Sequence, residues 1–269
     1  MTDGYQALRE GAAWLDLSAR ARIVARGRDR ARFLHNLTTN DVKKLTPGDS
    51  LYAFLLTPQG RIIGDVNILC RPDDLLLDTE PELREKVRLH ILKYKVADQV
   101  ELEDVTDTMA AIGVEGPAAP PAPEGFTTAP FTVTGQPGYR IYCSPEQKHD
   151  VIQRLEAARV RPATLEDARV VRIENGKPRY GEDILETSLP QETDQMQAVS
   201  FNKGCYLGQE IVERIRAPGH VNKHLRMVDL PEVVPPGTKL TLDGKDAEIT
   251  SSIYSPARKK VIGLAYVRT

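Results

Sequence analysis

The chain has 269 residues, of which 41% are hydrophobic and 28% are charged, so it can form two domains or three small ones and is not a disordered chain. Its net charge of −2 provides no general attraction to nucleic acid or to an acidic membrane surface. No apolar run approaches the length of a membrane span, and the first residues show neither the basic start nor the apolar core of a signal peptide.

Three cysteines, Cys70, Cys143 and Cys205, lie far apart in the chain. Their odd number and wide spacing do not fit a disulfide framework, and no C-x-x-C or Cys/His pair has the spacing of metal ligands. We therefore expect a protein of the reducing cytoplasm that holds no metal of its own. Because an iron–sulfur cluster usually needs about four ligands, we also expect that this chain does not carry such a cluster alone.

Hydrophobic periodicity, capping residues and turn signals predict alternating helices and strands up to residue 176. Helices are expected at 5–17, 29–37, 81–94, 145–155 and 164–176. Strands are expected at 22–27, 51–56, 61–70, 75–78, 100–103, 109–113 and 139–143, of which 51–56 and 61–70 form a hairpin. This alternation predicts α+β sheets with helices packed on one face.

The pattern changes near the C-terminus. Four runs of alternating residues are separated by Pro-Pro-Gly, Asp-Gly and Ser-Pro turn signals, at 224–230, 238–242, 246–252 and 261–266. We expect these four strands to form a small β-barrel.

Six arginines gather near the N-terminus, at positions 20, 22, 26, 28, 30 and 32. A phosphate or RNA site is one interpretation of this cluster. No aromatic residues are interleaved as stacking platforms for bases, so a solvated basic face is the better interpretation. We do not expect nucleic acid as a partner.

Asp65 is a candidate site residue because it lies in the middle of the expected strand 61–70, among apolar neighbours. A carboxylate in this position either lies on the solvated face of the sheet or points into a pocket. The sequence leaves both alternatives open.

Cys205 lies two residues after Lys203 and just before an expected helix that begins after Gly208. Unpaired backbone N–H groups, the positive end of the helix dipole and the lysine ammonium would all favour a thiolate. The alternative is a cysteine that only packs in the interior.

The residues from 203 to 210, KGCYLGQE, resemble the K-G-C-[YF]-x-G-Q-E signature of the YgfZ-type folate-binding proteins. These proteins are related to the aminomethyltransferase (T-protein) of the glycine cleavage system and are linked to iron–sulfur cluster assembly and repair. A second segment, RIENGKPRYGED at 172–183, resembles the R-[IL]-E-A-G-x-x-x-[YF]-G-x-D pattern that both families share. The T-T-N-D run at 38–41 and the hairpin that follows it also resemble T-proteins.

The resemblance implies roles for individual residues. Glu174 would accept hydrogen bonds from the pterin ring of folate, and its carboxylate suits the adjacent N–H groups of an aminopyrimidine. Asp65 would lie next to the reacting nitrogens, although one of the two acidic positions of the family is Gly64 in this chain. Cys205 would be a reactive thiol with Lys203 as its activator. Tyr206 and Gln209 complete the predicted folate-binding residues.

The fold that the resemblance implies is a clover with a folate-sized opening at its centre. It has an N-terminal α+β lobe (1–105), a middle α+β lobe (106–217) and a C-terminal β-barrel (218–269). The last part of the middle lobe, which carries the cysteine motif, is expected to pack on the first lobe.

The leading functional hypothesis is a protein that binds tetrahydrofolate, or a one-carbon derivative of it, and supports the assembly or repair of iron–sulfur enzymes. Its partners would then be folate and iron–sulfur client or assembly proteins, with no membrane involved. The alternative is a folate-dependent aminomethyl or one-carbon transferase of the T-protein type. T-proteins have F-x-G-R-[ED] where this chain has Cys205 to Glu210, so Gln209 replaces an arginine, and we do not expect a typical aminomethyltransferase.

Overall fold

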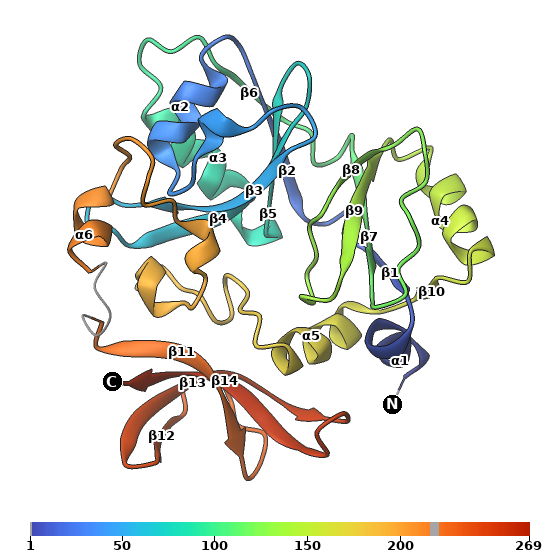
Figure 1. The fold of residues 1–269 in the computed structure, drawn as a ribbon, viewed down its shortest axis with the longest axis vertical. Coiled ribbons are helices and arrows are strands. Elements are labelled where there is room, and N and C mark those ends of the chain that lie inside the picture. Colours follow the sequence, from blue (N-terminus) through green and yellow to red (C-terminus); the bar gives the residue numbers. More distant parts are fainter. Residues whose placement is uncertain (1, 216–220) are drawn as a thin grey trace.

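The computed structural model describes residues 2–215 and 221–269. It contains three β-sheets, which Figure 1 shows as three groups of strands with helices between and around them. We call them the N-terminal, middle and C-terminal sheets. Among the described residues, no helix is both long and apolar enough to cross a membrane.

The N-terminal sheet has five strands in the order β3-β4-β5-β2-β6, and all its neighbouring strands are antiparallel. The strands are β2 (Ala21–Arg26), β3 (Ser50–Leu56), β4 (Ile62–Cys70), β5 (Leu75–Thr79) and β6 (Glu101–Asp104). Helices α2 (Arg30–Leu37) and α3 (Arg84–Lys93), with the short 3-10 helices η1 (Val42–Lys44) and η2 (Pro81–Leu83), pack against its apolar face. The expected strands, hairpin and two helices of this region are confirmed to within a few residues.

The middle sheet has the order β10-β1-β7-β9-β8. Its strands are β1 (Ala13–Asp16), β7 (Ala110–Glu115), β8 (Thr127–Ala129), β9 (Gly138–Cys143) and β10 (Arg161–Pro162). Helices α1 (Asp3–Glu10), α4 (Lys148–Ala157) and α5 (Leu165–Glu174) accompany it. The capping box predicted at the start of α5, between Thr164 and Asp167, is present.

The helix predicted over 5–17 is wrong in its second half. Helix α1 ends at Glu10, and Gly11 takes a non-helical conformation (φ −129°, ψ −128°) that ends the helix. The next residues form β1, which pairs with β7 on one side and β10 on the other. Trp14 and Leu15 therefore anchor a strand of the middle sheet rather than a helix of the first lobe.

The C-terminal sheet has the order β11-β14-β13-β12 and is antiparallel throughout. Its strands are β11 (Lys223–Leu230), β12 (Lys239–Leu242), β13 (Lys245–Ser255) and β14 (Lys260–Arg268). All four strands were predicted, but among the described residues they form one curled open sheet and not the closed barrel that we expected. Side chains on one face of the sheet, including Leu225 and Ile262, pack with Ile173 of α5, while the other face has an apolar cluster of its own around Ile249 and Ala265.

The segment after α5 returns to the N-terminal sheet. It contains η3 (Pro190–Glu192) and η4 (Met196–Ala198) and ends in the short helix α6 (Gln209–Arg214). Tyr206 and Val212 belong to the same apolar core as β3 and β4, and Figure 1 shows α6 beside these two strands. The expected boundary between residues 217 and 218 lies outside the described residues, and the three domain ranges stay predictions.

The arginine cluster is not one solvated face. Arg20 and Arg22 are buried. Arg20 forms ion pairs with Asp78 and Glu80, while Arg22 donates to backbone carbonyls, among them that of Thr106. Ion pairs also hold two outer members of the cluster, Arg26 and Arg32. The solvated-face interpretation is therefore wrong for Arg20 and Arg22, whose charges belong to the interior.

Candidate functional site

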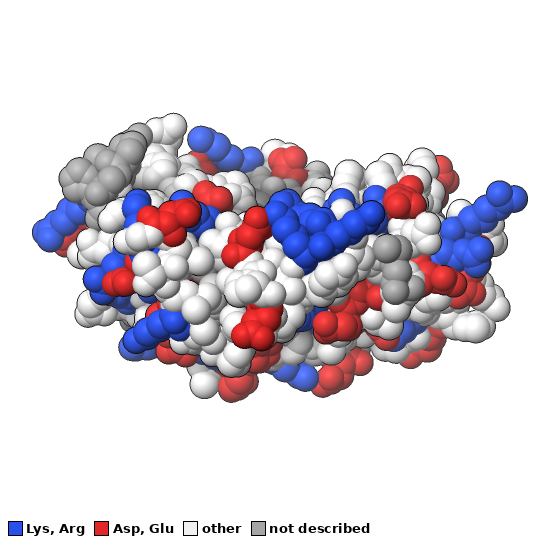
Figure 2. All heavy atoms as spheres, turned by 90° about the horizontal axis from the view of Figure 1, so that it is seen from below, with Lys and Arg blue, Asp and Glu red and all other residues white. Residues whose placement is uncertain are grey.

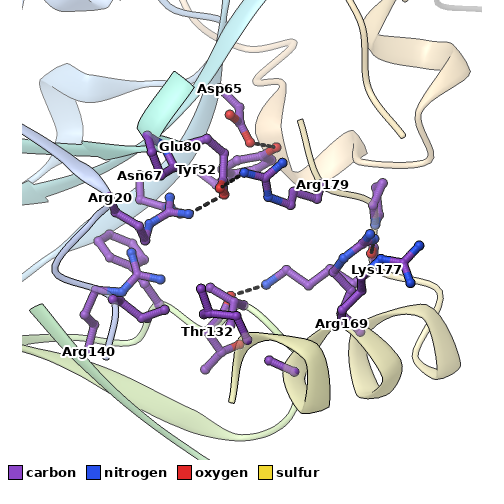
Figure 3. Close-up of a pocket in the computed structure, with 18 of the residues that line it drawn as sticks. Arg20, Tyr52, Asp65, Asn67, Glu80, Thr132, Arg140, Arg169, Lys177 and Arg179 are labelled. Atoms are coloured by element: carbon purple, nitrogen blue, oxygen red, sulfur yellow. Dashed lines mark hydrogen bonds and ion pairs between the residues drawn. The ribbon is translucent and has the colours of Figure 1, made fainter. Parts of the chain in front are cut away.

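A cavity of about 680 Å³ lies between the N-terminal sheet, the middle sheet and α5. Small-molecule sites usually occupy a few hundred to about a thousand Å³ and present a few polar groups on an apolar wall. Figure 3 shows polar side chains from all three parts around the open centre, namely Arg20, Tyr52, Asp65, Asn67, Glu80, Thr132, Arg140, Arg169, Lys177 and Arg179. The cavity has the size and the lining of a ligand site.

Asp65 points into this cavity because of its place in β4. Side chains alternate between the two faces of a strand. At Gly64 a Cβ would lie 3.1 Å from Leu83 Cδ1 and 3.2 Å from Val87 Cγ2, so that position faces the apolar core under η2 and α3. Position 65 faces the other way and lines the cavity. A carboxylate at position 64 would be buried among apolar side chains, so the glycine there removes nothing from the cavity.

The carboxylate of Asp65 is incompletely paired. Its Oδ2 accepts a hydrogen bond from the Tyr52 hydroxyl at 2.8 Å, and its Oδ1 is shut off from solvent without a hydrogen-bond partner among the described residues. Burial, followed by repulsion from the Glu80 charge, raises the pKa of Asp65 to about 6. A ligand that offers N–H donors to this wall would favour the ionised form of Asp65.

Glu80 lies between two arginines at the same wall. Burial would raise its pKa, but the charges of Arg20 and Arg179 outweigh burial and hold the pKa of Glu80 below its usual range. Arg179 Nη2 lies 2.9 Å from Glu80 Oε2, and Arg20 also donates to Glu80. One carboxylate of the wall is thus held ionised by arginines, while Asp65 is left as the acidic group that can still change its protonation state.

The opposite side of the cavity carries Lys177, which follows α5. Its ammonium donates to the backbone carbonyl of Thr132, and no carboxylate of the described residues lies within ion-pair distance of it. Burial lowers the pKa of Lys177 to about 8. No local pattern singles out Lys177, Tyr52 or Asn67, because the cavity that they line is formed by segments far apart in the chain.

The predicted pterin ligand Glu174 does not line this cavity. It is buried near the end of α5, where the Tyr5 hydroxyl lies 2.8 Å from its Oε1 and the Ser255 hydroxyl donates to the same oxygen. Arg9 Nε lies 3.5 Å from its Oε2. Glu174 therefore joins α1, α5 and the turn between β13 and β14, and the geometry supports a structural role for it.

We expect Glu174→Ala to lower the free energy of unfolding by about 2–4 kcal/mol, because buried hydroxyls of Tyr5 and Ser255 lose a charged acceptor. Urea unfolding measures this loss. Ligand affinity of the folded protein should stay at the wild-type level. Unchanged stability together with weaker folate binding would instead support the pterin role.

The cysteine motif lies on another part of the molecule. Lys203 Nζ donates to the carbonyl oxygens of His35, Thr38 and Asn40 and closes the C-terminal end of α2. Burial lowers the pKa of Lys203 to about 7. The lysine ammonium is thus directed to backbone carbonyls, and no hydrogen bond or ion pair among the described residues joins it to Cys205.

The other motif residues also have identifiable surroundings. Gly208 takes a left-handed conformation (φ 82°), and a Cβ there would lie 2.5 Å from the Thr57 carbonyl oxygen, so only glycine fits against the β3–β4 hairpin. Gln209 Oε1 accepts a hydrogen bond from the Tyr206 amide at 3.2 Å, and the Tyr206 ring is buried. Cys205 is exposed, whereas Cys70 and Cys143 are buried.

Cys205 and Tyr206 line a second, shallow depression of about 400 Å³ together with His35, Asn36, Lys43 and Gly204. This depression and the central cavity share no lining residue. The structure therefore places Asp65 in one candidate site and Cys205 with Tyr206 in another, with Gln209 and Glu174 in neither lining.

Comparison with known proteins places this geometry in a recognised fold. Residues 1–130 match the GCVT N-terminal domain. The structure of the glycine cleavage system aminomethyltransferase T from Bartonella henselae superimposes with a TM-score of 0.86 over 98% of this chain and 80% of that one, at 17% identity. The chain has the aminomethyltransferase fold.

Curated relatives agree with this assignment of the fold. The aminomethyltransferase of Geobacillus kaustophilus is 28% identical over 296 residues, which cover 98% of this chain and 81% of the relative. That of Caldanaerobacter subterraneus subsp. tengcongensis is 27% identical, with 98% and 79% covered. A putative chloroplastic transferase of Arabidopsis thaliana is 26% identical, with 99% and 67% covered. The predicted likeness to T-proteins is confirmed at the level of the aminomethyltransferase fold.

Proposed function

We propose that this protein binds tetrahydrofolate, or a one-carbon derivative of it, in the central cavity and supports the assembly or repair of iron–sulfur enzymes. The observation that carries folate binding is the wall at Asp65, where a buried and incompletely paired carboxylate lines a cavity of about 680 Å³. The pterin of folate offers adjacent N–H donors, which suit a carboxylate acceptor. The aminomethyltransferase fold and the names of the relatives support the same ligand class.

The residues of the cavity fit such a ligand at both ends. Asp65, with Tyr52 behind it, would accept the N–H groups of the pterin. Lys177, whose ammonium has no carboxylate partner among the described residues, would favour an anionic group such as the glutamate tail of folate. The pterin role thus moves from Glu174 to Asp65.

The iron–sulfur role rests on the resemblance of the cysteine motif and on the exposure of Cys205. Its neighbours in the motif have structural contacts: Lys203 closes α2 and Gly208 fits the hairpin. Packing therefore accounts for Lys203 and Gly208 in the motif. It does not account for the exposed Cys205, and this supports a chemical role for the thiol. The client or assembly proteins would meet this exposed surface.

The aminomethyltransferase alternative is favoured by relatives that match 98% of the chain. The structure weakens one objection to it, because Gly64 faces the core and its missing carboxylate would not have reached the cavity. Incubation with an aminomethyl-lipoyl carrier and tetrahydrofolate distinguishes the two. We expect no methylenetetrahydrofolate, and sustained formation of it would favour the transferase.

The test of the proposed function has two parts. Titration calorimetry should show saturable binding of tetrahydrofolate to the wild-type protein and to Cys205→Ser with equal affinity. In a strain that lacks the gene, the wild type should restore iron–sulfur enzyme activities and Cys205→Ser should not. Cys143→Ser, which alters a buried cysteine of the middle sheet, is the matched control and should restore them. Absence of folate binding refutes the first part, and full restoration by Cys205→Ser refutes the second.

A further inference from the structure

The backbone on both sides of Cys205 is fastened to the end of α2. Before it, Lys203 Nζ donates to the carbonyl oxygen of His35. After it, the amide of Leu207 donates to the carbonyl oxygen of Asn36 at 3.0 Å. The two hydrogen bonds join residues that are 168 and 171 positions apart in the sequence. They hold the segment that contains Cys205 beside the end of α2.

Gly204 brings the same segment close to the His35 ring. A Cβ at Gly204 would lie 3.7 Å from His35 Nε2, so the ring nitrogen faces the backbone immediately before Cys205. His35 and Cys205 both line the shallow depression of about 400 Å³. His35 and Cys205 thus border the same small surface.

The His35 side chain is only 5% exposed, and its two ring nitrogens differ. Nδ1 lies 3.2 Å from Asp41 Oδ1 without the alignment of a hydrogen bond, so the two interact through charge alone, and Asp41 also pairs with Lys44. No hydrogen bond from a described residue reaches Nε2. A carboxylate at Nδ1 favours the tautomer with its proton on Nδ1, which leaves Nε2 as a proton acceptor.

The charges around the ring keep it neutral. Burial, then the positive charge of Lys203 and to a smaller degree that of Lys43, lower the pKa of His35, while Asp41 raises it. The net direction is downward from the usual value of about 6.5, so the ring is uncharged at pH 7. A neutral imidazole can take a proton from a thiol, directly or through one water molecule.

We propose that His35, oriented by Asp41, is the base that activates Cys205. This inference rests on the proposed chemical role of Cys205 and assigns its activator, which is His35 rather than Lys203. The thiol proton passes from Sγ to Nε2, and the resulting thiolate and imidazolium stabilise each other. The thiolate then attacks a soft electrophile. With iodoacetamide, an S–C bond forms, the C–I bond breaks, iodide leaves and the imidazolium releases its proton to water.

The test is the rate of Cys205 alkylation by iodoacetamide, followed by peptide mapping, at pH 7 and at pH 9.5. We expect His35→Gln to slow alkylation at pH 7 by about tenfold or more and to leave the rate at pH 9.5 nearly unchanged, because hydroxide replaces the base there. Asp41→Asn, which alters only the orienting group, should slow the pH 7 reaction by a smaller factor. A distorted surface would slow alkylation at both pH values, so a lower rate at pH 7 alone indicates the loss of the base.

His149→Gln is the matched control, because it removes an exposed histidine on α4 of the middle lobe, and it should alkylate like the wild type. The anchors of Lys203 and Leu207 use backbone carbonyls, so His35→Gln should keep them. If this variant does not fold, the pH–rate profile of Cys205 alkylation in the wild type replaces it. We expect the rate to rise as the His35 ring loses its proton below pH 6.5 and then to level off, whereas a thiol without a base would keep gaining rate up to about pH 8.5.

Equal alkylation rates at pH 7 for wild type and His35→Gln would overturn the proposal, as would a wild-type rate that rises steadily up to about pH 8.5 without levelling off. Failure of this inference is separable from failure of the proposed function. Tetrahydrofolate binding should be the same in all these variants, because the two linings share no residue. A wild type that alkylates rapidly but does not bind folate would refute folate binding and leave the thiol pair in place.

Discussion

Asp78→Asn is expected to lower the free energy of unfolding at pH 7 by about 3–5 kcal/mol, the cost of breaking a buried ion pair from one side. Asp78 lies on β5 and is fully buried. Its Oδ1 is 2.7 Å from both Arg20 Nε and Arg140 Nη1, and its Oδ2 accepts a hydrogen bond from the Tyr142 hydroxyl. An amide in its place would leave two buried guanidinium groups with too little negative charge.

The loss of stability in Asp78→Asn should become smaller at low pH. Burial would raise the pKa of Asp78, but the charges of Arg140 and Arg20 outweigh it and lower that pKa to about 2. A carboxyl with a depressed pKa stabilises the folded state above its unfolded pKa of about 4, and this contribution is lost as the pH falls from about 4 to 2. The stability gap between wild type and Asp78→Asn should therefore narrow over that interval.

Urea unfolding at pH 7 and at pH 3 measures both effects. Asp229→Asn is the control, because Asp229 pairs with Lys260 on the surface and both side chains are exposed. An exposed pair contributes about 1 kcal/mol or less, so this variant should differ little from wild type. A difference in the free energy of unfolding below 1 kcal/mol between wild type and Asp78→Asn at pH 7 would contradict this role of the ion pairs of Asp78 with Arg20 and Arg140.

The sequence predicted most of the helices and strands because each rests on local patterns. The strands of the N-terminal sheet and the four C-terminal strands were visible as alternating runs between turn signals. The capping box at Thr164 marked the start of α5 correctly. The error at β1 arose because Trp14 and Leu15 fit a helical spacing as well as a strand, and only their pairing with β7 decides between the two.

Side-chain partners from distant segments were beyond the reach of the sequence. Glu174 was expected to bind the pterin, but its partners Tyr5 and Ser255 come from 169 and 81 residues away and enclose it. Lys203 was paired with Cys205 because the two are neighbours in the chain. Its long side chain instead reaches the end of α2, and His35, which shares the depression with Cys205, could not be recognised without the fold.

Asp65 was singled out correctly as a carboxylate in the middle of a strand, and the structure answers the question that the sequence left open. Strand alternation turns Gly64 to the core and Asp65 to the cavity. The neighbouring groups that set its electrostatics, Tyr52 and Glu80, come from other strands or loops of the same sheet. A local pattern therefore identified the residue, and only the tertiary structure shows its surroundings.

Asp65→Asn is expected to weaken tetrahydrofolate binding by at least tenfold and to raise the free energy of unfolding at pH 7. Affinity falls because the amide keeps one acceptor oxygen but loses the charge, and a hydrogen bond to a charged group contributes about 1.5–3 kcal/mol. Stability rises because the pKa of Asp65 is raised to about 6 by burial and by Glu80, so the ionised group costs free energy in the folded state.

The stability of the protein and its folate affinity should depend on the protonation of Asp65 in opposite directions. A carboxyl with a raised pKa contributes stability that is fully present below its unfolded pKa of about 4 and is lost as the pH rises through about 6. The stabilisation by Asp65→Asn should therefore appear at pH 7 and fade towards pH 4. Folate binding has the opposite preference, because N–H donors favour the ionised carboxylate. Wild-type affinity should fall below pH 6, and Asp65→Asn should lack this dependence.

Titration calorimetry from pH 5.5 to 7.5, with urea unfolding of the same samples, measures both properties. Glu174→Ala is the matched carboxylate variant and should show the reverse pattern, with lower stability and unchanged affinity, since its partners are Tyr5 and Ser255 rather than the cavity. If Asp65→Asn binds tetrahydrofolate as tightly as wild type while Glu174→Ala does not, the pterin lies at Glu174 and the central cavity serves another ligand. Opposite shifts of stability and affinity in the two variants would instead assign the ligand to Asp65 and the structural role to Glu174, because no general loss of folding produces that combination.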